Sequence, residues 1–222
     1  MKTPVTSKRI RDHFAYAWWK YLLLAVIAVF TVNIYYTMTR YQPPEEKKIV
    51  LGLYAYGSET ALNEYMEQVR TTAMPDMELM EAQFIAMDEA YGEMILTTRI
   101  AARECDLYAL PRTQFQNYAA DGGFMAIDQV LPELVALLEE QGVSLSRGWR
   151  ELGDTGEKHL YGIPCAGLPG MKNMMYTDPS DYYLSLFFET GNDENAIAFF
   201  DRFVRDMLLE TPATPTDLVT GE

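Results

Sequence analysis

The chain has 222 residues, a formal net charge of −14, two cysteines and two histidines. The charge is uneven, because residues 49–222 hold 10 of the 18 Lys and Arg and 29 of the 32 Asp and Glu, a net charge of −19. Such an acidic surface repels nucleic-acid phosphates and anionic lipid headgroups, so nucleic-acid binding is excluded.

Near the N-terminus, an apolar stretch with no charge from residue 21 to 36 predicts a single transmembrane helix over residues 18–38. Its length matches the about 20 residues that a helix needs to cross the hydrocarbon core, and aromatic residues stand at both edges. Lys and Arg concentrated before it place the N-terminus in the cytoplasm. A buried core helix and a cleaved signal peptide are the alternatives. The following sequence, NIYYTMTRYQPP, offers no small-x-small cleavage site, which favours an uncleaved anchor.

The flanking segments divide the rest of the chain. The basic residues 1–17 could continue the helix inward, lie along the headgroups or form a solvated tail. Residues 39–48 form a linker that two prolines stiffen. We expect an extracellular folded domain over 49–210, and a disordered tail over 211–222, where apolar content is too low for folding.

Within the domain, strand and helix patterns alternate, which indicates a parallel sheet with right-handed crossovers. In chain order, the patterns predict a strand over 49–56, a helix capped by Ser58, a strand over 77–84, an amphipathic helix with Tyr91, Met94, Ile95, Thr98 and Ala102 on one stripe, a strand over 105–110, a helix around 113–120, a helix from Pro132, a short strand over 159–164, a strand over 182–188 and a last helix capped by Asn192. The fold class is therefore α/β, a three-layer domain behind one N-terminal transmembrane helix.

The two cysteines, Cys105 and Cys165, are both expected on the oxidising side of the membrane. A disulfide between them would close a loop of about 60 residues and contribute about 4 kcal/mol in the chain-entropy model. Two buried thiols that pack as small hydrophobes are the other interpretation. The sequence leaves both open.

No motif for catalysis or for cofactor binding stands out. His13 and His159 have no partner at metal-ligand spacing, and the chain has no P-loop, no G-x-S-x-G and no Gly-rich nucleotide turn. We therefore predict a domain that is not an enzyme and needs neither a metal nor another cofactor.

Four short motifs occur in an order that resembles the extracellular solute-binding proteins of ATP-driven (ABC) importers, particularly the sugar-binding ones. They are CDLYALP at 105–111, GGFMAIDQVL at 122–131, YGIP at 161–164 and FFETGNDENAIAFFDRFVRDML at 187–208. In that family a second lobe separates YGIP from the last helix, whereas only about 20 residues do so here. The resemblance thus implies one lobe of a type II periplasmic-binding protein, with the second lobe missing.

A ligand of an open α/β sheet binds beyond the carboxyl ends of its parallel strands. Tyr54, Tyr56 and Arg112 are the candidate ligand-binding residues there, because aromatic rings stack on sugars. The alternative is that the tyrosines cover the core and the arginine is merely exposed.

These observations lead to two functional hypotheses. The first is a single-pass protein of the cell membrane whose extracytoplasmic domain acts as an accessory or recognition subunit beside a membrane protein such as a transporter permease. The second is a weak binding protein for a small solute, such as a sugar, that delivers it to an ABC importer. An enzyme of unrecognised class would need a polar cleft cluster that the sequence does not reveal.

Overall fold

The computed structural model describes residues 7–39, 41, 43–88, 91–151 and 156–209, without the side chains of 8–10 and 12–14. The chain divides into two compact units, Met1–Gln42 and Pro43–Glu222. The predicted tail over 211–222 lies outside the described residues.

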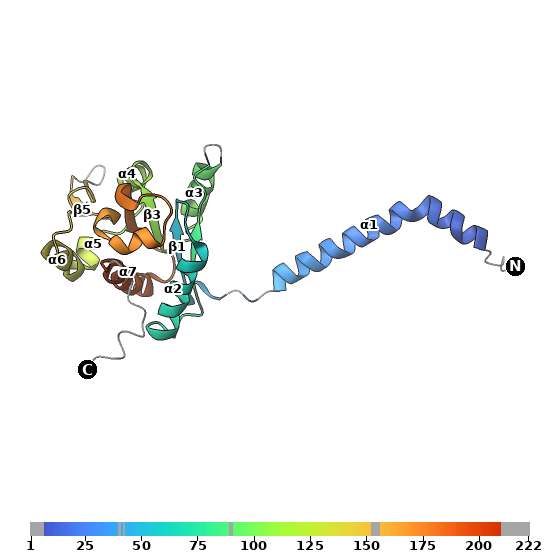
Figure 1. Ribbon diagram of the computed structural model, residues 1–222, viewed down its shortest axis with the longest axis horizontal. Coiled ribbons are helices and arrows are strands. Elements are labelled where there is room, and N and C mark those ends of the chain that lie inside the picture. Colours follow the sequence, from blue (N-terminus) through green and yellow to red (C-terminus); the bar gives the residue numbers. More distant parts are fainter. Residues whose placement is uncertain (1–6, 40, 42, 89–90, 152–155, 210–222) are drawn as a thin grey trace. The chain divides into compact units, whose positions relative to one another are not determined.

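The first unit contains helix α1, Ser7–Thr39 (Figure 1). The helix begins well before residue 18, where the sequence placed the start of the span. Its part Ala15–Thr39 is long and apolar enough to cross a membrane, a criterion that a signal sequence also meets. The apolar side chains of this part are largely exposed, as a helix that contacts lipid requires.

The second unit alternates strands and helices from Lys48 onward (Figure 1). In chain order its elements are η1 Glu45–Lys47, β1 Lys48–Leu53, α2 Glu59–Thr72, β2 Leu79–Phe84, α3 Gly92–Ala101, β3 Leu107–Pro111, α4 Arg112–Ala120, α5 Ile127–Val130, α6 Pro132–Glu140, β4 Trp149–Glu151, β5 Lys158–Leu160, β6 Ile163–Pro164, η2 Cys165–Gly167, η3 Pro169–Asn173, η4 Pro179–Asp181, β7 Tyr182–Leu186 and α7 Asp193–Met207. The turn η1 belongs to this unit, although the sequence assigned its residues to the linker.

The main sheet has the strand order β2-β1-β3-β7-β6. β1 pairs in parallel with both β2 and β3, as the alternation of strands and helices predicted. β7 runs antiparallel to β3 and pairs Tyr182 with Pro111, and β6 runs antiparallel to β7. The sheet is therefore mixed, and the carboxyl end of β3 lies beside the beginning of β7.

Helices cover both sides of this sheet, which confirms the three-layer α/β class. The buried apolar residues form two clusters, and successive residues of β1 belong to different ones. Leu51 packs in a cluster with α2 and α7, and Val50 packs in a second cluster with α3 and α4. Cys105 and Cys165 are free, buried thiols. They lie in different clusters, Cys105 with Val50 and Cys165 with Leu51.

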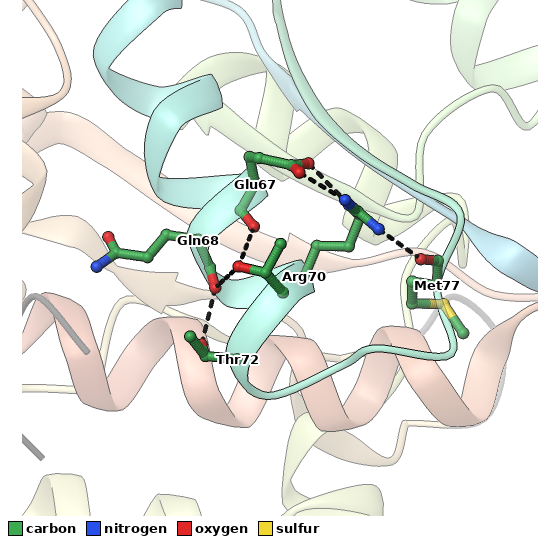
Figure 2. A network of polar contacts seen from close by, with 6 residues as sticks. Glu67, Gln68, Arg70, Thr72 and Met77 are labelled. Atoms are coloured by element: carbon green, nitrogen blue, oxygen red, sulfur yellow. Dashed lines mark hydrogen bonds and ion pairs between the residues drawn. The ribbon is translucent and has the colours of Figure 1, made fainter. Parts of the chain in front are cut away.

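Helix α2 illustrates how local sequence fixes an element. The Ser58 hydroxyl accepts a hydrogen bond from the Ala61 amide at 3.3 Å and so caps the helix as predicted. At the other end, the Arg70 guanidinium pairs with Glu67 and donates to the Met77 carbonyl at 3.3 Å (Figure 2). The end of α2 is thereby tied to the segment that leads into β2.

The YGIP motif does not form the single strand that was predicted over 159–164. The motif is divided between two sheets: β5 pairs with β4 in a separate hairpin, and β6 joins the main sheet. A Cβ at Gly162 would lie 2.6 Å from the Phe115 ring and 3.0 Å from Ser185 Oγ. Only glycine allows this close approach, at the point where the chain passes from one sheet to the other.

Two helices differ in detail from the sequence expectation. Asn192 precedes α7, but its side chain makes no capping bond and instead donates to the Lys48 carbonyl at 2.9 Å. On α3 the apolar stripe around Met94 is not the buried side; Gly92 and Leu96 are buried instead. Periodicity identified the helix but did not determine which of its sides meets the sheet.

Candidate functional site

The carboxyl edge of the parallel strands is where the sequence places a ligand. Here the chain leaving β1 is held by the segment that follows η3. The Tyr56 amide donates to Thr177 Oγ1 at 3.3 Å, the Tyr176 amide donates to the Tyr56 carbonyl at 2.8 Å, and Gly57 forms an isolated bridge with Met175. These bonds bring together residues about 120 positions apart in sequence, and they fix the backbone of this edge.

Tyr54 is one of the three predicted ligand-binding residues, and its side chain is only 6% exposed. It packs in the cluster of Val50 and Leu96. Burial raises the pKa of its hydroxyl, and the charge of Glu93 adds to the effect. Its carbonyl accepts a hydrogen bond from the Tyr182 hydroxyl at 3.1 Å. In this structure Tyr54 belongs to the core beneath the edge.

Arg112 is the second predicted residue, and it forms an ion pair with Asp181. The pairing of Pro111 with Tyr182 explains this contact, since Arg112 follows the one residue and Asp181 precedes the other. Nε of Arg112 is buried and has no hydrogen-bond partner among the described residues. Because Nε is enclosed by protein atoms, a solute in the surrounding water does not reach it.

Tyr56, the third predicted residue, is exposed and belongs to a group of exposed apolar side chains that we call the edge ridge. The edge ridge consists of Tyr56 (52% exposed), Tyr91 (63%), Met94 (60%), Ile95 (40%) and Tyr176 (77%). Tyr91, Met94 and Ile95 lie at the beginning of α3, which is close to this edge because a Cβ at Gly92 would lie 2.9 Å from the Tyr54 hydroxyl. Of this group, the sequence analysis named only Tyr56 as a candidate ligand-binding residue.

The edge ridge offers flat rings and a flexible thioether to water. Such side chains stack on sugar rings or form the centre of a protein interface. Within the described residues, no group of three or more His, Cys, Asp or Glu could hold a metal ion. Burial raises the pKa of Cys105 to about 11 and that of Cys165 to about 12, so neither is a thiolate nucleophile at neutral pH.

A polar cluster away from this edge connects α5 to the hairpin formed by β4 and β5. Nδ1 of His159 lies 2.9 Å from Asp128 Oδ2, and Asp128 Oδ1 accepts a hydrogen bond from the Leu160 amide at 2.9 Å. The hydrogen bond to Asp128 raises the pKa of His159 above its ordinary value of 6.5. The sequence gives no local sign of this pair, because Asp128 and His159 are 31 residues apart.

This pair predicts a pH-dependent contribution to stability. A raised pKa in the folded state means that the contribution is fully present below pH 6.5 and is lost as the pH rises through the higher, folded-state pKa. We therefore expect the difference in melting temperature between wild type and His159→Gln to be larger at pH 6 than at pH 9. Calorimetric scans across this range check it, and a difference independent of pH would contradict it.

The opposite edge of the sheet carries a different kind of surface. A hollow of about 860 Å³ is lined there by residues before β1 and β2 and at the beginning of α7. Its lining includes Glu46, Asp76, Glu189, Asp193 and Glu194, so it repels anions. None of the three predicted ligand-binding residues lines it.

No protein-family model matches this chain, and a search of curated proteins gives no match. Several solved structures are similar to about half of it. The first is a protein of extracellular solute-binding protein family 1 from Alicyclobacillus acidocaldarius. It is 17% identical in sequence with a TM-score of 0.35, and the match covers 55% of this chain and 29% of that one.

The second is an ABC substrate-binding protein of Listeria monocytogenes in complex with cycloalternan, 20% identical with a TM-score of 0.34, over 52% of this chain and 28% of that one. The third is the galacto-N-biose- and lacto-N-biose I-binding protein of the ABC transporter of Bifidobacterium longum, 19% identical with a TM-score of 0.33, over 55% and 29%. All three are of the class that the motif order resembles. The matches span less than a third of the length of these proteins.

Proposed function

We propose that this chain is a membrane-anchored, non-enzymatic recognition domain that acts as an accessory subunit of a transporter or another envelope complex. In this proposal α1 crosses the cell membrane once with its N-terminus in the cytoplasm, and the unit from Pro43 onward lies outside. Support comes from the apolar part Ala15–Thr39, from the Lys and Arg that precede it, and from the acidic composition that follows it.

The edge ridge is the observation that carries the proposed recognition role. The unit that bears it is strongly acidic, so five exposed apolar side chains near one edge stand out from the surrounding composition. Aromatic and Met side chains are enriched at the centres of protein interfaces. A membrane tether also raises the local concentration of the domain for a partner in the same membrane, such as a transporter permease.

The test is co-purification of the full chain from its native membranes. We expect a membrane protein to be retained by wild type and to be lost at least about ten-fold with the double variant Met94→Asp and Ile95→Asp, because each aspartate puts an unpaired charge into an apolar contact. Ala101→Asp, at the other end of the exposed side of α3, is the matched control. Equal retention by all variants would reject the edge ridge as the contact.

The anchor itself has a separate test. Protease added outside sealed cells is expected to digest the domain and to leave the N-terminal segment before the span Ala15–Thr39 intact. A domain that is protected in sealed cells would contradict the proposed orientation. A domain released from the membrane by an alkaline wash would contradict the anchor.

The second candidate function is weak binding of a small solute such as a sugar, for delivery to an ABC importer. It is favoured by the exposed rings of Tyr56 and Tyr176, whose backbones are hydrogen-bonded. Calorimetry with a panel of neutral oligosaccharides separates the two functions. Heat of binding that disappears in Tyr176→Ala favours this candidate, and no heat with any saccharide rejects it.

A further inference from the structure

In the described part of helix α1, the side chain of Asn33 differs from those of the neighbouring threonines. The hydroxyls of Thr31, Thr37 and Thr39 donate to carbonyls four residues earlier, at 2.7–2.9 Å. The carboxamide of Asn33 is exposed and makes no such bond within the described part of α1. A carboxamide carries two donors and an acceptor oxygen, all of which need partners when water is excluded.

The depth of Asn33 decides whether water can supply those partners. It lies six residues from the middle of Ala15–Thr39, which corresponds to about 9 Å along a helix that rises 1.5 Å per residue. The hydrocarbon core extends about 15 Å on each side of the bilayer centre. If α1 spans the membrane, Asn33 therefore lies inside the hydrocarbon, where an unsatisfied polar group is unfavourable.

Asn33 also lines a groove along one side of α1. The groove has a volume of about 410 Å³ and is formed by Ala25, Val26, Val29, Phe30 and Asn33. Positions 25, 29 and 33, with 26 and 30 beside them, follow the spacing of a seam between two packed helices. The small side chain of Ala25 allows a close approach of another helix backbone.

We propose that the occupant of this groove is α1 of a second copy of the chain, with the two Asn33 carboxamides hydrogen-bonded to each other. This rests on the proposed single-pass anchor. All copies of such an anchor insert in the same direction, so a parallel pair places both Asn33 side chains at the same depth. A carboxamide is also its own complement, since it donates and accepts. A different helix would need a polar group at that depth.

The electrostatics of the second unit indicate that the helix, rather than the domain, drives this association. Each copy carries a net charge of −19 over residues 49–222, so two domains repel each other unless salt screens them. The expected dimer is thus held within the membrane.

Disulfide cross-linking of the full chain in its native membranes tests the proposal. Val29→Cys places a thiol in the groove, and Thr31→Cys places one about 200° around the helix as the matched control. The native thiols are buried, and the unmodified chain controls for them. After mild oxidation we expect Val29→Cys to give a covalent dimer at least about ten-fold more efficiently than Thr31→Cys. Adding Asn33→Leu should lower the association by about 3- to 20-fold, the effect of one interhelical hydrogen bond, whereas Asn33→Gln should retain most of it.

The outcomes distinguish this inference from the proposed function. A chain that an alkaline wash releases from the membrane refutes the anchor and the dimer together. A chain that stays in the membrane but cross-links equally at positions 29 and 31, or is insensitive to Asn33→Leu, refutes the dimer alone. A cross-linked product that contains a different protein also overturns the second copy as the occupant.

Discussion

Gly148→Ala is expected to destabilise the second unit by about 3 kcal/mol or more, or to prevent folding. A Cβ on Gly148 would lie 1.8 Å from the carbonyl oxygen of Gly162 and 2.8 Å from a methyl group of Leu160. The carbonyl is backbone and cannot rotate away as a side chain does. The Gly148 carbonyl also accepts a hydrogen bond from the Tyr161 amide at 3.1 Å, so a displacement of Gly148 weakens a bond to the YGIP motif.

Chemical denaturation of the purified chain measures this effect, and Gly142→Ala is its control. Gly142 follows α6 with a φ of +76°, and a Cβ there would meet no atom within 4 Å. Its amide donates to the Glu139 carbonyl, and the Val143 amide donates to the Leu138 carbonyl, as in a Schellman C-cap. We expect a cost of about 1 kcal/mol from the left-handed backbone alone. Equal losses of unfolding free energy in the two variants would contradict the expected clash between a Cβ at position 148 and the Gly162 carbonyl.

Asp206→Ala is expected to destabilise the chain by about 3 kcal/mol. The buried carboxylate joins α7 to α2, because Oδ2 accepts from the Tyr65 hydroxyl at 2.8 Å and from Arg202 Nε at 3.0 Å. Its removal leaves the Tyr65 hydroxyl buried without an acceptor. Burial of the Tyr65 hydroxyl, together with the negative charge of Asp206, raises the pKa of Tyr65 well above its ordinary value.

A double-mutant cycle separates the hydrogen bond from the packing. Tyr65→Phe removes only the hydroxyl and is expected to cost about 1 kcal/mol, and its combination with Asp206→Ala should cost less than the sum of the two. Asp201→Ala is the control, because Asp201 forms an ion pair with Arg205 on the same helix at a more exposed position, and such pairs contribute about 0.5 kcal/mol. If the losses of unfolding free energy in Tyr65→Phe and Asp206→Ala simply add in the double variant, the hydrogen bond between the two side chains does not contribute to stability.

Part of the carboxyl edge was accessible from sequence because it depends on strand order. A strand, helix, strand, helix, strand pattern places the ends of β1 and β3 together, and Tyr56 and Arg112 follow these two strands in the chain. The partners of these residues were not accessible. Asp181 meets Arg112 only because β7 returns antiparallel to β3, and Tyr176 meets Tyr56 only because a long irregular segment folds back over the edge.

By itself, the sequence determined the features that depend on local periodicity and composition: the apolar helix α1, the Ser58 cap, and the α/β class. Only the tertiary structure decided which side of α3 is buried, where the YGIP motif changes sheets, and which distant groups pair, as His159 does with Asp128. The physical reason is that a helix or strand signal is repeated over neighbouring residues. The direction in which an element packs is instead fixed by contacts with residues far away in the chain.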